Sequence, residues 1–187
     1  MRNPLAISTM AVLLAAIVSP GRAEERQSSV TVYTSPEINL GEIDREIIDQ
    51  VGAGGYINFA AFVLSDYAII DALRSAALRG ARIRLYLDPE ELTRLRLSED
   101  HPLVKLVHTQ GVDTRVKAGG EGLMHLKAYS VSGALLRTGS ANESVSGLEH
   151  QDNDLEIITD RAAIAAFDRK FKLMWDRPTN VNFNYPQ

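Results

Sequence analysis

The chain has 187 residues, 45% of them hydrophobic and 24% charged, a composition that fits one globular domain and excludes a coiled coil or a wholly disordered chain. It contains no cysteine, which excludes a disulfide scaffold, a thiolate metal site and a cysteine nucleophile. The formal net charge of -4 excludes a chain that is basic throughout, so any affinity for phosphate would have to come from a local group of cations.

The first residues predict an export signal. Arg2 precedes an unbroken apolar run, Met10–Val18, and the small residues Gly21 and Ala23 follow. A basic start, an apolar centre and small residues before the cleavage point are typical of a secretory signal peptide, residues 1–23. We therefore expect a mature domain of residues 24–187 in a periplasmic or secreted protein. An uncleaved membrane anchor is the alternative, but the run is far shorter than the ~20 residues needed to cross a bilayer.

Strand and helix patterns alternate along the rest of the chain. Short β-branched or continuously apolar runs predict strands, and apolar residues at helical spacing predict amphipathic helices. In chain order we expect a strand at 29–33, a helix at 40–51, a strand at 56–64, a helix capped by Ser65 or Asp66 and ended by Gly80, a strand at 82–87, one or two short helices within 89–110, a strand at 113–117, a hairpin of 126–132 and 134–138 around Gly133, a strand at 155–159 and a helix at 161–175. This alternation predicts a layered α/β domain.

The residues suited to chemistry lie between His125 and Asp154. His125 and Lys127 are two apart in a predicted strand, so their side chains share a face. Ser140 and Asn142, again two apart, follow the second strand of the hairpin, which would return them to the first pair. Lys127 could neutralise phosphate oxygens, to which Ser140 and Asn142 could donate hydrogen bonds. A phosphodiester fits this set of side chains.

Two further roles complete this hypothesis. A neutral His125 could attack phosphorus and form a covalent phosphohistidine. Asp154 could bind the other ring nitrogen and so fix the imidazole tautomer, as a buried carboxylate does in other nucleophile–histidine systems. The remaining histidines, His101, His108 and His150, lack the spacing of a metal site.

The sequence around these residues also resembles the motifs of a known protein family. His125-Leu126-Lys127 followed by Gly139-Ser140-Ala141-Asn142 looks like the H-x-K…G-S-x-N signature of the phospholipase D superfamily. Three other segments are similar to parts of that family, namely Asn58–Phe62, Arg79–Asp88 and the acidic stretch Asp152-Asn153-Asp154-Leu155. The resemblance covers about residues 30–175. It implies a layered α/β/α sandwich around a mixed β-sheet, with His125, Lys127 and Asp154 as catalytic residues and Lys127, Ser140 and Asn142 as phosphate-binding residues.

The chain departs from the family pattern at two positions. Ser132 stands where the family has aspartate, a residue that usually supports the turn rather than touching phosphate, so we expect activity to survive. Asp154 stands where glutamate is more frequent, and its shorter side chain could loosen the contact to the histidine.

Four arginines lie close together in the sequence, namely Arg74, Arg79, Arg82 and Arg84. We interpret this cluster as a solvated helix end and strand edge rather than a track for nucleic acid.

The chain carries one such motif, as do the small bacterial endonucleases of this superfamily. Those proteins place two motifs face to face across a homodimer axis, which implies a homodimer with one composite site. One His125 would be the nucleophile and its symmetry mate the general acid, with no metal or cofactor. We therefore expect an exported, non-specific endonuclease acting on DNA or RNA.

Two other functions remain open. One is a phospholipase D that hydrolyses glycerophospholipids, because the motif is shared between the two activities. The other is a non-catalytic phosphate-binding module, which Ser132 alone favours. The charge balance counts against nucleic acid: residues 1–23 hold two arginines and no acid, which leaves the mature chain 18 basic and 24 acidic residues, a net of -6.

Overall fold

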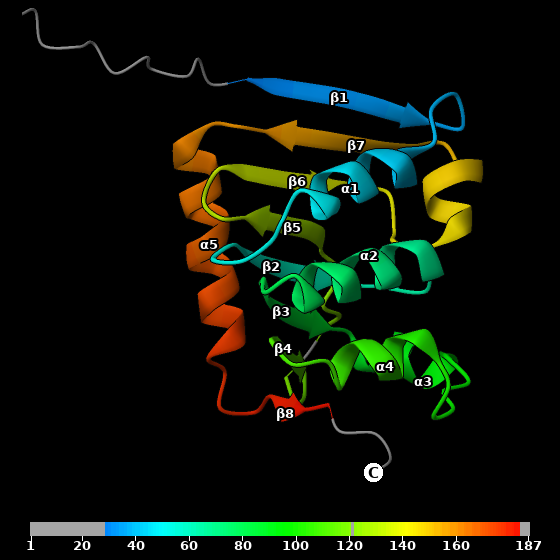
Figure 1. Cartoon of the computed structure of the whole chain (residues 1–187), viewed down its shortest axis with the longest axis vertical. Coiled ribbons are helices and arrows are strands. Elements are labelled where there is room, and N and C mark those ends of the chain that lie inside the picture. The colour runs from blue at the N-terminus through cyan, green and yellow to red at the C-terminus, as the bar shows by residue number, and fades with distance from the viewer. Residues whose placement is uncertain (1–28, 121, 184–187) are drawn as a thin grey trace, which may run out of the picture.

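The computed structural model describes residues 29–120 and 122–183, so the predicted signal peptide lies outside the described part of the chain (Figure 1). The strands are β1 (Val30–Ser35), β2 (Tyr56–Ala61), β3 (Arg82–Leu87), β4 (Val112–Val116), β5 (Lys127–Val131), β6 (Leu135–Gly139), β7 (Asn153–Ile158) and β8 (Val181–Asn182). The helices are α1 (Leu40–Asp49), α2 (Tyr67–Leu78), α3 (Pro89–Arg94), α4 (Pro102–Val107), the short π-helix η1 (Ser146–His150) and α5 (Arg161–Trp175).

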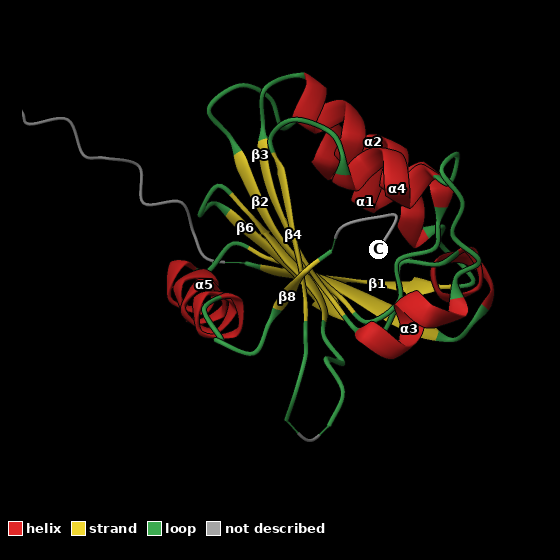
Figure 2. Cartoon of the chain, turned by 90° about the horizontal axis from the view of Figure 1, so that it is seen from below, coloured by secondary structure: helices red, strands yellow, loops and turns green. Residues whose placement is uncertain are grey.

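The strands form one mixed sheet in the order β1-β7-β6-β5-β2-β3-β4-β8. The pairs β2–β3 and β3–β4 are parallel, and the other neighbouring pairs of described strands are antiparallel. Helices α1, α2 and α4 lie on one face of the sheet and α5 on the other (Figure 2). The predicted α/β/α sandwich around a mixed sheet is therefore confirmed.

Each main helix begins at a residue whose side chain can satisfy free backbone N–H groups. Asn39 caps α1, Asp66 caps α2, Asp88 caps α3 and Asp160 caps α5. Of the two candidates for α2, Ser65 and Asp66, the aspartate is the cap. The helices therefore begin within a residue or two of the expected positions.

The core has two unequal halves. The larger half lies between the sheet and helices α1, α2 and α4, and it contains fully buried side chains such as Ile48, Phe59 and Leu73. The smaller half lies under α5 around Phe171. The helix is attached there through Asp168, whose Oδ1 accepts hydrogen bonds from the amide of Asn58 on β2 (3.0 Å) and the hydroxyl of Ser130 on β5 (2.6 Å). Among the described helices none is long and apolar enough to cross a membrane.

The structure places Ser132 in the β5–β6 turn. Its φ of +50° is a left-handed conformation that a serine adopts only where the surroundings require it. Its N–H donates to the carbonyl of Tyr56 at 3.0 Å, and its Oγ accepts from the N–H of Tyr56 at 3.1 Å. Ser132 thus ties the turn to the start of β2.

Two small elements, β8 and η1, were not expected from the sequence.

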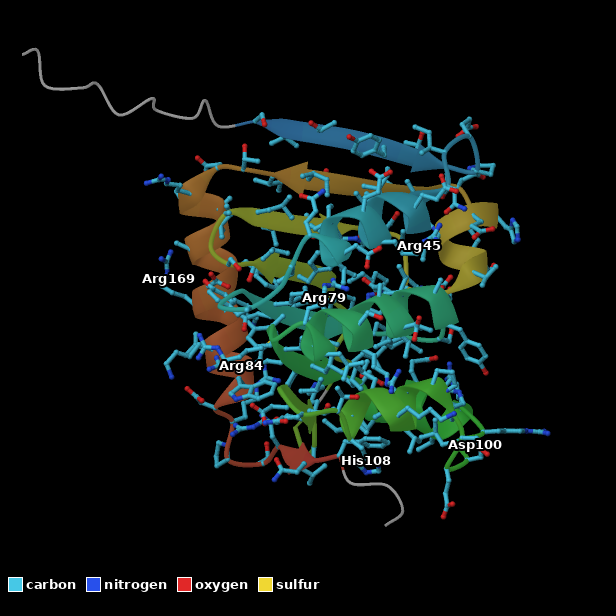
Figure 3. All side chains as sticks on the ribbon, in the orientation of Figure 1. Arg45, Arg79, Arg84, Asp100, His108 and Arg169 are labelled. Atoms are coloured by element: carbon cyan, nitrogen blue, oxygen red, sulfur yellow. The ribbon has the colours of Figure 1, made fainter. Side chains whose placement is uncertain are left out.

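Two arginines of the cluster seen in the sequence, Arg79 and Arg84, lie apart in the structure (Figure 3). Arg79 donates to the carbonyls of Ile48, Asp49 and Val51 at the end of α1. Arg84 lies on the α5 side, 5.7 Å from the centre of the Trp175 ring. The cluster therefore does not form one continuous basic surface.

Candidate active site

The chain path brings the predicted site residues to one edge of the sheet. Because β5 is antiparallel to β2, the start of β5 lies beside the end of β2, and Lys127 pairs with Ala61. Strand β6 returns antiparallel to β5, and β7 to β6, so the end of β6 and the start of β7 reach the same edge, beside η1 in Figure 1. His125, Lys127, Ser140, Asn142 and Asp154 all come from these strand ends.

His125 and Lys127 meet, although not as neighbours within one strand. We expected both residues in the strand, but β5 begins at Lys127 and His125 lies in the preceding loop. The Lys127 Nζ lies 3.3 Å from His125 Nε2 and donates to the carbonyl of His125 at 3.0 Å. An ammonium only donates hydrogen bonds, so a hydrogen bond in this contact would run from Lys127 to Nε2, in the tautomer that carries its proton on Nδ1.

Phe62 supports both side chains, and the sequence did not single it out as a site residue. Its ring lies 4.5 Å from the His125 ring, measured between centroids, and 4.7 Å from Lys127 Nζ. The second contact is a cation–π interaction, which favours the charged amine. Phe62 follows Ala61 at the end of β2, and the pairing of β2 with β5 could have indicated its position.

The two members of the pair differ in exposure. His125 is exposed, whereas Lys127 is 7% exposed. Burial lowers the pKa of Lys127, and the carboxyl of Glu143 opposes this shift. A phosphate that reaches His125 would therefore meet an ammonium held in a site of low dielectric, where its charge is more effective than in water.

Ser140 and Asp154 form a second contact pair. The carboxylate Oδ1 of Asp154 accepts hydrogen bonds from the Ser140 hydroxyl and, at 3.2 Å, from the Ser140 N–H. The same hydroxyl lies 3.1 Å from Oδ1 of Asn153. Within the described residues of this chain, Asp154 makes no hydrogen bond to His125, the partner that we expected for it. Ser140 must therefore turn from Asp154 to donate to a substrate oxygen.

Asn142 lies in the loop after Ser140, half-buried, and its Oδ1 is buried without a hydrogen-bond partner. Two glycines allow the backbone to pass close to this loop. A Cβ at Gly147 would lie 2.6 Å from the carbonyl oxygen of Asn142, and a Cβ at Gly139 would collide with the carbonyl oxygen of Asp154. Gly139 also has φ +141°, which side chains rarely permit. The glycines thus fix the loop that carries Ser140 and Asn142.

A buried charged network lies beneath the site, and the sequence did not predict it. Arg137 on β6 is fully buried, and its Nε and Nη2 donate to the carboxylate of Asp44 on α1 at 3.1 and 3.0 Å. Its Nη1 donates to the carbonyls of Lys127 (3.0 Å) and Ala141 (3.3 Å) and lies 3.3 Å from Oε1 of Glu143. One guanidinium therefore joins both strand ends that carry the site residues.

The loop before His125 is fixed by Asp88. One carboxylate oxygen caps α3, and the other accepts the N–H of Met124 at 2.8 Å. No group of three or more His, Asp or Glu in the described residues is placed to hold a metal ion.

The fold and the site together define a phospholipase D-like domain. A family model described as "Cardiolipin synthase, PLD-like domain" matches residues 47–175, more than half of the chain. The chain therefore belongs to the phospholipase D superfamily, as its motifs indicated.

Comparison with individual proteins gives relatives of low identity. The mitochondrial cardiolipin hydrolase of Xenopus laevis is 24% identical over 141 residues, which are 75% of this chain and 64% of that protein. The chain thus spans less than two thirds of this relative. Two solved structures share the fold: a phospholipase D family member, Nuc from Salmonella typhimurium (TM-score 0.72, 19% identity, 84% of this chain and 99% of that chain), and NucT from Helicobacter pylori (TM-score 0.73, 17% identity, 84% and 100%).

Proposed function

We propose that this protein hydrolyses phosphodiester bonds through a covalent phosphohistidine on His125. The observation that carries the proposal is the 3.3 Å contact between His125 Nε2 and Lys127 Nζ, beside the loop of Ser140 and Asn142. This contact places a nucleophile next to a cation at an exposed edge of the sheet. A phosphate bound to the ammonium would lie within reach of the imidazole.

The reaction follows in two steps. In the first, Nε2 of His125 forms a bond to phosphorus, the bond from phosphorus to the leaving oxygen breaks, and that oxygen takes a proton from a general acid. In the second, water forms a bond to phosphorus, the bond from phosphorus to Nε2 breaks, and the water gives a proton to the same group, which frees His125 and releases a phosphomonoester. Lys127, Ser140 and Asn142 stabilise the charge on the non-bridging oxygens. Asp154, which holds Ser140 in the free protein, positions that hydroxyl.

The general acid is the His125 of a second copy, because the described chain presents one such histidine in an open site. We propose a homodimer with one composite active site. If each reaction needs both imidazoles, wild-type and His125→Ala chains refolded together in equal amounts should retain about one quarter of the all-wild-type activity, as random pairing into symmetric dimers predicts. About one half would show that each chain works alone, and a monomer mass by light scattering would contradict the dimer directly.

Nucleic acid is the favoured substrate. The apolar hollow beside Phe62, which Leu64, Leu87, Leu92 and Leu95 help to line, has a volume of only about 10 Å³. A space of that size cannot enclose an acyl chain, so a lipid would have to be cleaved with its acyl chains outside the protein, whereas a nucleic acid needs no such space. A glycerophospholipid is the second candidate because the curated relative is named a cardiolipin hydrolase.

We also propose that the protein is exported, on the basis of the apolar run at Met10–Val18.

The first test is plasmid DNA cleavage by the purified mature protein in excess EDTA, beside its His125→Ala variant. We expect cleavage by the wild type and a loss of at least about a thousandfold in the variant, since removal of a nucleophile abolishes the covalent step. Equal cleavage by both proteins would overturn the mechanism.

Parallel assays with vesicles of cardiolipin or phosphatidylcholine separate the substrates. Release of phosphatidate without DNA cleavage would show that the substrate is a glycerophospholipid. Phosphate binding without turnover of either substrate would select the non-catalytic module.

A further inference from the structure

Glu143 is a buried carboxyl that the proposed reaction does not use. It follows Asn142 directly, its side chain is fully buried, and neither carboxyl oxygen has a hydrogen-bond partner. Its backbone is fixed, because its carbonyl accepts the N–H groups of Ser65 and Asp66 at 2.9 and 3.0 Å. A buried polar group without a hydrogen bond is costly, so its presence beneath the site requires an explanation.

The two buried carboxyls beside Arg137 differ in their contacts. Asp44 and Glu143 are two carboxyls around one guanidinium, that of Arg137, and all three side chains are fully buried. Asp44 accepts two hydrogen bonds from Arg137 and a third from the Tyr129 hydroxyl at 2.8 Å. Glu143 has only the 3.3 Å approach to Nη1, which is not aligned for a hydrogen bond. Asp44 therefore has the contacts that stabilise a negative charge, whereas burial without a hydrogen bond favours the protonated form of Glu143.

The groups that face Glu143 come from three elements. They are Arg137 on β6, Asp44 on α1, and Lys127 and Tyr129 on β5, while Asp66 is engaged as the cap of α2. Burial raises the pKa of Glu143 to about 8, although Arg137 opposes this shift. The carboxyl therefore changes charge just above neutral pH, close to an ammonium that binds phosphate.

Arg137 Nη1 is the link between Glu143 and the site. It donates to the carbonyls of Lys127 and Ala141, so it sets the distance between the start of β5 and the loop of Ser140 and Asn142. A charged Glu143 would compete for this nitrogen. It would also place a negative charge beside Lys127 and weaken the attraction of that ammonium for phosphate.

We propose that Glu143 is a positioning residue for this site: uncharged, it leaves Arg137 to hold the carbonyls of Lys127 and Ala141, and charged, it draws Arg137 away and offsets the Lys127 ammonium. The inference rests on the proposed function, because the group that it acts on is the phosphate-binding lysine. Phosphate affinity should consequently fall as Glu143 loses its proton, while the group that attacks phosphorus stays the same.

Glu143→Gln tests the proposal because glutamine has the shape of the protonated acid and cannot ionise. We would measure kcat and KM from pH 6.5 to 9.5 for the wild type, for Glu143→Gln and for Glu99→Gln, an exposed control. Between pH 7 and 9 we expect the wild-type KM to rise about fivefold more than that of Glu143→Gln, a modest effect for one charge acting across a few ångströms. Glu99→Gln should follow the wild type. Superimposable KM profiles for wild type and Glu143→Gln would overturn the inference.

Two readouts do not depend on turnover. The infrared band of a protonated carboxyl should vanish from the wild type as pH rises through 8 and be missing from Glu143→Gln throughout. Calorimetry with inorganic phosphate should show affinity that falls more with pH in the wild type than in the variant, even if no substrate is cleaved. Loss of turnover with these two signals present would reject the proposed function alone. Turnover without them would reject only the role of Glu143.

Discussion

Replacing Lys127 by methionine is expected to lower kcat/KM by about 10² to 10³, the range seen when one preorganised charge-stabilising group is removed. Methionine preserves the length and the apolar contacts of the side chain beside Phe62, so the change isolates the ammonium. Lys127 is 7% exposed and burial lowers its pKa, so the ammonium is less favourable in the folded protein than in water. Steady-state kinetics at pH 7 would measure the loss.

Lys127→Arg is the matched comparison. It retains the charge, but the longer, planar guanidinium cannot occupy the same position between Phe62 and the His125 carbonyl, so we expect partial activity. Thermal unfolding should show both variants folded at the assay temperature. A Lys127→Met protein with kcat/KM within about threefold of wild type would remove Lys127 from the transition state, since a charge-stabilising contact is worth far more.

Arg137→Met is expected to lower the free energy of unfolding by about 3–5 kcal/mol, the cost of breaking a buried ion pair by removing one partner. The change leaves the Asp44 carboxylate buried with only the Tyr129 hydroxyl as a donor, and it frees the carbonyls of Lys127 and Ala141. Urea unfolding at pH 7 would measure the loss.

The double variant Asp44→Asn/Arg137→Met separates charge from packing. An asparagine oxygen can still accept from Tyr129, and no unpaired charge remains, so the double variant should recover part of the lost stability. A loss of less than about 1 kcal/mol in Arg137→Met would mean that the buried network is not needed for stability. A double variant less stable than Arg137→Met would mean that charge is not the cause.

The layered fold was predictable because its elements carry strong local signals. Nearly continuous apolar runs such as Tyr56–Ala61 predict strands with both faces covered, and the capping residue Asp66 lies where the helical pattern begins. The grouping of His125 with Lys127 was equally predictable, since both lie within three residues of one strand start. The β8 strand is only two residues long, and a pairing so short leaves no periodic pattern to recognise.

The support beneath the site was not predicted, because a charge in a strand is ordinarily a surface residue. Arg137 lies in a five-residue strand, and only its partners show that it is buried. A signal was nevertheless present at Asp44. It lies four residues after Leu40 and four before Ile48, on the stripe of helix α1 that faces the core. A charged residue in that stripe requires a buried partner, and the sequence alone cannot say which arginine supplies it.

The position of Asp44 in the chain determines where a fragment that keeps the site intact can begin. The residues that would touch substrate all lie between His125 and Asp154, and the region matched to the family model begins at residue 47. The carboxylate that fixes Arg137 stands outside that region, on the first helix. A fragment that began at residue 47 would keep every motif residue and would still lack the carboxylate that holds Arg137 beneath the site. The smallest active fragment of this protein therefore has to include helix α1 as well as the motifs.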